Sequence, residues 1–393
     1  MVVSSGTDQG LSSEAGTGMG AGADAGKGEF AEPAARPPET GRPGMGSKRG
    51  APLHSVRSAM GSAELGALLG AVVIFALFAL VDATPQHLWL TQVGLASWSQ
   101  QAAFFGIMAV PVALLMIGGE FDLSAGVQTG ATAILMGLLI GTWHLNAWLA
   151  IALTFAFAGC VGLINGYVVV KTKLPSFIVT LATFFILRGL SIGGVLLVNN
   201  GSTSVGLGSD THPPGLASAR AVFGSSFLPS SSLPGGYQTV TIWFVTVTAA
   251  AAWVLTRTTF GNWVYAVGGD VNAARNMGVP IARTKILLFV GTAVAGGLVG
   301  VISFTQASSA TSEQGVGYEF YYIIAAVIGG CLLRGGYGSA VGAALGACVI
   351  GMAFEGVIDA GWDSSWDFTF LGVVLFLAVA VNTIVYQRAT RAR

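Results

Sequence analysis

The sequence predicts an all-α, polytopic membrane protein with about ten transmembrane helices. Of its 393 residues, 53% are hydrophobic and only 9% are charged, whereas charged residues make up about 25% of a typical soluble domain. The apolar residues also gather in stretches of roughly 20, the length that a helix needs to cross the hydrocarbon core of a bilayer. Together, these two observations place the chain in a membrane.

Ten apolar stretches qualify as spans. The eighth is short and ends in the Gly-rich sequence GGCLLRGGYG, which favours a broken or re-entrant helix. We place the transmembrane domain at residues 61–390. The spans lie at about 65–82, 100–118, 123–142, 147–170, 175–198, 239–256, 285–306, 320–333, 338–357 and 367–386.

Residues 1–60 have a different composition. They are rich in Gly, Ala and Pro and contain little that a folded core could bury, so we expect a disordered cytoplasmic tail. Their GADAGKG stretch is a chance match to a phosphate-binding loop, because that motif needs Gly-Lys-Ser/Thr after a strand and Lys27 is followed by Gly28. We therefore expect no nucleotide hydrolysis by this chain.

The basic residues indicate the orientation in the membrane. If the N-terminus is cytoplasmic, all of the 18 Lys and Arg residues except Arg188 and Arg220 lie on the cytoplasmic side, as the positive-inside rule predicts. Arg188 falls within the fifth span, and Arg220 in an extracytoplasmic loop at 199–238. An odd number of spans would move the C-terminal arginines outside, so we expect both termini to be cytoplasmic.

A polar, Gly-marked segment at residues 257–284 separates the sixth and seventh spans. Its NAARNMG stretch predicts a short helix that ends at Gly278, with Pro280 beyond the end. The Gly268–Gly269 pair before it permits a tight bend. Such a helix can transmit a push from a soluble partner to the spans. From residue types alone, a solvated loop is the alternative.

This segment, TTFGNWVYAVGGDVNAARNMGVPIARTK, resembles the coupling loop of permease subunits of bacterial ABC sugar importers, the ribose/xylose/galactose class. Asn262 stands where that family usually has Arg, and Asp270 where it usually has Asn. The resemblance implies an ATPase-coupling site at Gly261, Tyr265, Gly268, Gly269, Asp270, Asn272, Ala273, Ala274, Arg275 and Gly278.

Three further stretches are similar to the same family: GGEFDLSAG, LPSFIVTLATFFILRGL and GYEFYYIIAAVIGGCLLRGGYGSAVGAALGA. With the coupling segment they cover about residues 65–390 in the family's order. The resemblance implies a non-catalytic subunit without a cofactor of its own. It implies three protein partners: a cytoplasmic ATPase, an extracytoplasmic solute-binding protein and a second permease chain. Lipid surrounds such a subunit, and nucleic acid is not expected to bind.

Polar residues inside the predicted spans are candidates for the solute pathway, because charged groups at membrane depth usually face a cavity or a partner. Arg188 either lines the pathway or pairs with an acid nearer the outer face. Thr180 and Thr183 offer hydroxyls on one helix face. Asp122 and Ser124 are placed to cap the third span or to contact solute. Ionisable groups are too few for a proton relay, which suits an uncharged solute.

We therefore expect an ABC importer permease of the inner membrane that carries a monosaccharide. One alternative is a permease for branched-chain amino acids or nucleosides, and another is an ion-coupled carrier that works alone. His, Cys and acidic residues form no cluster in the sequence that would make a catalytic centre or a metal site, so we expect no enzyme activity.

Overall fold

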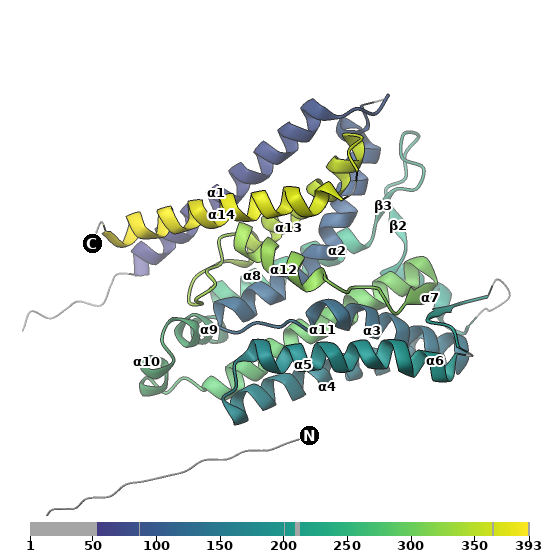
Figure 1. The fold of residues 1–393 in the computed structure, drawn as a ribbon, viewed down its shortest axis with the longest axis horizontal. Coiled ribbons are helices and arrows are strands. Elements are labelled where there is room, and N and C mark those ends of the chain that lie inside the picture. Colours follow the sequence, from purple (N-terminus) through teal and green to yellow (C-terminus); the bar gives the residue numbers. More distant parts are fainter. Residues whose placement is uncertain (1–52, 86, 200, 209–212, 364, 392–393) are drawn as a thin grey trace, which may run out of the picture. The chain divides into compact units, whose positions relative to one another are not determined.

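The structure is a computed structural model that describes residues 53–85, 87–199, 201–208, 213–363 and 365–391. It is mainly helical in these ranges (Figure 1). Helix α3 continues as the π-helical turn η2 (Leu138–Thr142), and α5 continues through η3 (Leu190–Gly194) into α6 (Val195–Val198). The main apolar helices are α1 (Leu53–Val81), α2 (Gln92–Ile117), α3 (Ala125–Gly137), α4 (Ala147–Thr172), α5 (Ser176–Gly189), α8 (Val240–Arg257), α11 (Ile281–Ala307), α12 (Tyr318–Ile328), α13 (Ala340–Asp359) and α14 (Trp366–Arg391).

Within the described residues, 8 helical segments are long and apolar enough to cross a membrane. Two shorter apolar stretches, Tyr318–Ile328 and Trp366–Ala380, coincide with the eighth and tenth predicted spans. Each predicted span is therefore helical, and the all-α membrane fold is confirmed. The eighth span is short, as predicted, because α12 ends at Ile328 and an irregular segment precedes α13.

Some predicted boundaries are wrong. Helix α1 begins at Leu53, so residues 53–60 are helical rather than part of a tail, while the rest of the predicted tail lies outside the described residues. Helix α2 begins at Gln92 rather than near 100, since the Thr91 side chain caps it by accepting the backbone N–H of Gly94. The predicted loop at 199–238 contains short elements: β1 (Ser204–Gly206), α7 (Leu216–Phe223), β2 (Ser226–Phe227) and β3 (Tyr237–Gln238).

Helices α2, α3, α11 and α13 form the interior, whereas α1, α5 and α8 expose most of their surface. Helix α13 packs on α2, and α11 packs on both α3 and α4. Close backbone approach allows this. A Cβ atom at Gly351 of α13 would lie 2.4 Å from the backbone nitrogen of Ala102, and one at Gly162 of α4 would lie 2.6 Å from the carbonyl oxygen of Phe289. Small residues are the usual solution for helix packing in lipid.

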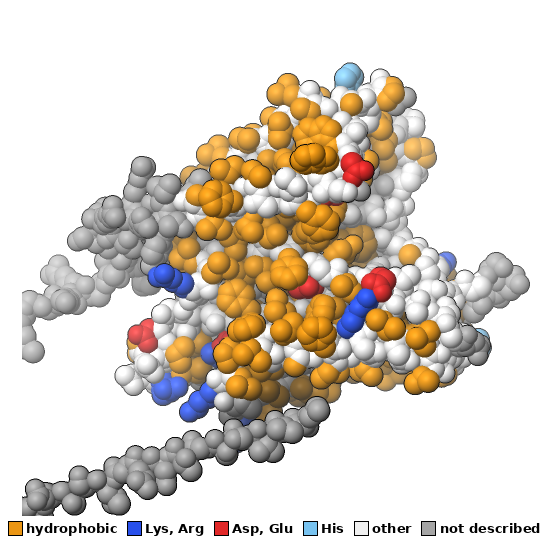
Figure 2. All heavy atoms as spheres, viewed as in Figure 1, with side chains coloured by type: hydrophobic (Ala, Val, Ile, Leu, Met, Phe, Trp, Pro, Cys, Tyr) orange, Lys and Arg blue, Asp and Glu red, His pale blue; other side chains and the backbone are white. Residues whose placement is uncertain are grey.

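The predicted coupling loop is mostly helical. It contains α9 (Thr259–Gly269) and α10 (Val271–Asn276), which lie at the same end of the bundle as the start of α1 and the end of α14 (Figure 1). The opposite end carries α7 and two short antiparallel pairings, β2 with β3 and β1 with β4 (Ser309–Thr311). Figure 2 shows hydrophobic side chains over the middle of one face and Lys and Arg side chains mainly at the end near α10.

Candidate functional site

Helix α10 is capped at both ends. The Oδ1 atom of Asp270 accepts the backbone N–H groups of Asn272 (2.8 Å) and Ala273 (3.0 Å), which is an N-cap. At the other end, Gly278 has a φ of 78° and donates its N–H to the carbonyl of Arg275 (3.0 Å). A left-handed glycine is a common helix terminator. The short helix predicted from NAARNMG is therefore present, and Gly278 ends it.

The bend predicted at Gly268–Gly269 is wrong. Both glycines lie in the last turn of α9, and neither has a positive φ. Gly268 is instead needed for close approach, because a Cβ atom there would lie 1.7 Å from the carbonyl oxygen of Ile117, at the end of α2, and 2.7 Å from the backbone nitrogen of Gly336. That nitrogen donates a hydrogen bond to the same Ile117 oxygen at 2.8 Å.

We name the contact among Gly119, Gly268, Gly335 and Gly336 the glycine junction. Gly119 follows α2, Gly268 lies in the last turn of α9, and the other two belong to the segment between α12 and α13. A Cβ atom at Gly335 would lie 2.9 Å from both the Cα atom of Gly119 and the carbonyl oxygen of Gly268. Backbone meets backbone here, so the three elements are in direct contact without side chains between them.

Tyr265 also links α9 to the segment between α12 and α13. Its hydroxyl donates a hydrogen bond to the carbonyl oxygen of Gly338 at 2.8 Å, just before α13. Burial raises the pKa of Tyr265 above its ordinary value, so the hydroxyl keeps its proton and remains a donor. Close by, Lys285 in α11 forms an ion pair with Glu120, which follows α2. Both of these side chains are mostly buried.

Three of the five predicted pathway residues, Asp122, Ser124 and Thr183, lie in one internal network of polar side chains. The Oδ1 atom of Asp122 accepts the backbone N–H (2.8 Å) and the hydroxyl (2.6 Å) of Ser124. Asn165 of α4 donates to the Ser124 hydroxyl (3.1 Å) and accepts the hydroxyl proton of Thr183 (2.6 Å). Ser124 makes no capping hydrogen bond with its side chain, so the cap predicted for it is wrong. Its hydroxyl is engaged by Asp122 and Asn165 instead.

The fourth predicted residue, Thr180, forms its hydrogen bonds with backbone groups. Its hydroxyl accepts the N–H of Leu123 at 3.0 Å, and Ser176, one turn earlier on α5, accepts the N–H of Phe121 at 3.0 Å. These two hydroxyls satisfy backbone donors of the irregular segment between α2 and α3, which would otherwise be costly to bury. The fifth residue, Arg188, donates to the carbonyl of Ser312 and forms an ion pair with Glu313, which is the acid-pairing alternative.

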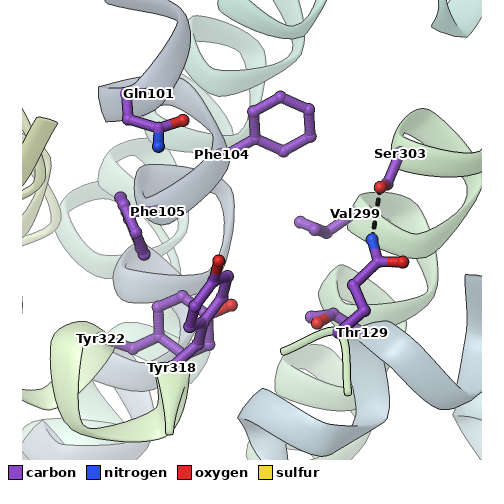
Figure 3. A pocket seen from close by; sticks show the side chains of 9 residues that line it. Gln101, Phe104, Phe105, Thr129, Val299, Ser303, Tyr318 and Tyr322 are labelled. Carbon is purple, nitrogen blue, oxygen red and sulfur yellow. Dashed lines mark hydrogen bonds between the residues drawn. The ribbon is translucent and has the colours of Figure 1, made fainter. Parts of the chain in front are cut away.

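A cavity of about 170 Å³ lies between α2, α12, α3 and α11 (Figure 3). Phe104, Phe105, Tyr318 and Tyr322 supply aromatic rings, and amide and hydroxyl groups are interspersed among them. None of the described residues that line it carries a charged side chain. The lining residues are Gln101, Phe104, Phe105, Thr129, Val299, Ser303, Gln314, Tyr318 and Tyr322.

Sequence reasoning missed this cavity, and none of its five pathway candidates lines it. A signal was present within single helices. Gln101, Phe104 and Phe105 are spaced to share one face of α2, and Tyr318 and Tyr322 one face of α12. Figure 3 shows Gln101, Phe105, Tyr318 and Tyr322 on one side of the cavity and Ser303, Val299 and Thr129 on the other, with the Phe104 ring extending between the two sides. The meeting of the two sides depends on helix packing, which spacing along a single helix does not reveal.

Comparison with known proteins identifies the family. Residues 94–379 match the family described as branched-chain amino acid transport system / permease component. The chain belongs to this family. A permease component is a transport subunit, and with its apolar helices this one is a multi-pass membrane protein.

The relatives of this permease are import permeases by name. The ribose import permease protein RbsC of Escherichia coli (strain K12) is 31% identical over 72% of this chain and 83% of its own length. The xylose transport system permease protein XylH of the same strain is 27% identical over 87% and 98%. The autoinducer 2 import system permease protein LsrC of Photorhabdus luminescens is 29% identical over 81% and 88%. No solved structure matches the permease.

Proposed function

We propose that this permease is the transmembrane subunit of an ATP-driven ABC importer that carries a monosaccharide of the ribose or xylose type across the inner membrane. The observation that carries the proposal is the lining of the cavity: aromatic rings on one side, neutral amide and hydroxyl groups around them, and no charged side chain among the described lining residues. Sugars present apolar C–H faces and many hydroxyls, which such a lining complements. Relatives named for ribose and xylose support the same class.

The amino-acid alternative is less well supported by the cavity. A free amino acid carries an ammonium and a carboxylate, and removing both from water is costly unless charged partners receive them. The acidic residues nearest in sequence to the lining residues do not face the cavity. Glu313 pairs with Arg188, and Glu319 is buried beside Gly126 rather than lining the cavity.

The permease is proposed to hydrolyse no ATP and to need no cofactor of its own, so the work comes from a separate ATPase. The ATPase is proposed to bind α9 and α10, where Arg275 is exposed and Asn272 lies beside it. Its movement would pass through the glycine junction to α2 and α12. These two helices bear the aromatic side of the cavity, and the junction lies roughly 18 Å along α2 from Phe105 at 1.5 Å per residue.

The orientation follows from charge. Lys171, Lys173, Arg257, Arg283 and Lys285 flank spans at the end that carries α9 and α10, and the positive-inside rule places this end in the cytoplasm. Both termini are then cytoplasmic. A second permease chain and an extracytoplasmic solute-binding protein are the further proposed partners, the latter at the end that carries α7.

Uptake into proteoliposomes tests the function. Purified permease, its ATPase and its binding protein are reconstituted with ATP inside, and labelled ribose, xylose, leucine and uridine are offered in turn. We expect ATP-dependent uptake of a pentose and none of leucine. Uptake of leucine or uridine in place of the sugars would replace the proposed solute, and uptake without any ATPase would instead indicate an ion-coupled carrier.

A cavity variant links the activity to the site. Gln101→Leu keeps the volume but removes an amide from the lining, so we expect uptake of the pentose to fall about fivefold, as for the loss of one hydrogen bond. Gln92→Leu is the matched control, because Gln92 lies at the start of the same helix and contacts Ser230 and Ser232 instead of the cavity. Equal effects of the two changes would argue against the cavity as the solute site.

A further inference from the structure

The ion pair of Arg188 holds a segment of the cavity wall. Arg188 lies near the end of α5, and its guanidinium donates to the backbone carbonyl of Ser312 and to the carboxylate of Glu313. The next residue, Gln314, lines the cavity. Arg188 itself does not, so its contact with the cavity runs through the backbone of this segment.

Helix α3 supports the same segment from another side. A Cβ atom at Gly130 would lie 2.0 Å from the carbonyl oxygen of Gln314, and one at Gly126 would lie 2.5 Å from that of Gly315. Two glycines one turn apart thus form a notch that receives the backbone. Thr129, between them in sequence, lines the cavity. The segment is therefore seated on α3, with Arg188 as its attachment to α5.

The Gln314 side chain completes the arrangement. Its Nε2 atom donates to the hydroxyl of Ser303 on α11, the bond marked by the dashed line in Figure 3. The carboxamide is thereby held at the edge of the cavity. A fixed amide that both donates and accepts suits a hydroxyl of a sugar.

The two contacts of Arg188 differ in how strongly they hold the segment. The Glu313 side chain is 72% exposed, whereas that of Arg188 is 20% exposed. An ion pair with a solvated partner contributes little, since solvent screens it. The contact with the Ser312 carbonyl is partly buried and restrains the backbone itself. A guanidinium can serve both acceptors at once, which a single ammonium does less well.

We propose that Gln314 recognises a hydroxyl group of the transported sugar and that Arg188 is the positioning residue that aims it, by holding the Ser312–Gln314 backbone against α3. This inference rests on the proposed function, because it identifies the residue in the cavity that recognises a hydroxyl group of the sugar. Gln314 sets solute discrimination, and Arg188 acts on discrimination only through Gln314.

The test compares solutes with and without one hydroxyl. The complete reconstituted transporter is supplied with binding protein saturated with either ribose or 2-deoxyribose, so that selection by the binding protein is removed. The measured quantity is the maximal uptake rate of ribose divided by that of 2-deoxyribose. We expect Gln314→Ala and Arg188→Gln each to lower this ratio about fivefold. The double variant should be no lower than Gln314→Ala alone. Glu313→Gln is the control and should stay within about twofold of the unchanged protein.

Additive losses in the double variant, or an unchanged ratio in Arg188→Gln, would overturn the positioning role. Hydrogen exchange of residues 312–317 supplies a readout that needs no solute: exchange should rise in Arg188→Gln and not in Glu313→Gln. If Arg188→Gln does not accumulate in the membrane, Arg188→Lys replaces it, with an intermediate ratio expected and an unchanged one counting against the proposal. Failure of the unchanged protein to carry ribose would reject the proposed solute, whereas normal ribose uptake with an unchanged ratio in the variants rejects this inference alone.

Discussion

The backbone of Gly268 lies so close to the carbonyl oxygen of Ile117 that a Cβ atom at position 268 would be 1.7 Å from it. Gly268 is in the last turn of α9, and Ile117 is the last residue of α2. At this point the segment between the sixth and seventh spans therefore meets the interior of the bundle backbone to backbone. Because neither partner is a flexible side chain, we expect displacement of α9 to be transmitted to α2 rather than absorbed by side-chain motion.

Gly268→Ala should disrupt this contact. A methyl group at 268 forces α9 away from α2, and overpacking of this kind typically costs about 1–3 kcal/mol. We expect ATP-dependent uptake in proteoliposomes to fall at least tenfold while the ATPase alone keeps its activity. Gly269→Ala is a matched control, since a Cβ atom there would meet nothing within 4 Å. Full uptake by Gly268→Ala would show that the glycine junction does not carry the coupling.

Gly278 is constrained by conformation rather than by space. Its φ is 78°, and a Cβ atom there would meet nothing within 4 Å. A β-branched residue strains this left-handed conformation by about 1–2 kcal/mol, whereas Asn tolerates it. We therefore expect Gly278→Val to raise the ATP hydrolysed per solute transported several-fold and Gly278→Asn to leave the ratio nearly unchanged. An equal effect of the two substitutions would indicate that side-chain size matters at this position rather than backbone conformation, which would contradict this explanation.

The Glu120–Lys285 ion pair joins the end of α2 to the start of α11. Its side chains are only 8% and 18% exposed, so removal of one partner leaves a largely buried charge without compensation. Glu120→Gln alone should lower stability by about 3 kcal/mol, seen as a lower melting temperature in detergent. Glu120→Gln with Lys285→Met should recover most of the loss. A double variant as unstable as the single one would show that the pair acts through something other than its charges.

Thr180 distinguishes a structural network from a solute pathway. Its hydroxyl accepts the N–H of Leu123, and Thr180→Val preserves the shape but leaves that buried donor unsatisfied, at a cost of about 1–3 kcal/mol. We expect a lower melting temperature with the apparent KM for solute unchanged. Thr246→Val, whose hydroxyl bonds within exposed α8, serves as the control. A changed KM with an unchanged melting temperature would instead indicate that Thr180 belongs to the solute pathway.

Helix ends were predictable where the signal is local. Asp270 and Gly278 cap α10 with atoms only a few residues away, so the short helix could be expected from NAARNMG. The same local reasoning was wrong at Gly268, because its partner Ile117 lies on another helix and a glycine looks alike whether it bends a chain or admits a neighbour. The cap predicted at Ser124 is wrong for the same reason, because its hydroxyl accepts a hydrogen bond from Asn165 of α4, a contact between helices that the local sequence does not reveal.

The sequence by itself determined that this chain lies in a membrane, where its spans run and that it resembles a sugar importer's permease. Hydropathy, charge and helix caps act over about one span length and can therefore be read in order along the chain. The tertiary structure alone decided which faces of α2 and α12 meet α3 and α11 around a cavity, and that Arg188 reaches Glu313, 125 residues away. Lipid-facing and core-facing apolar residues look the same in sequence, so contacts between helices emerge only when the helices pack.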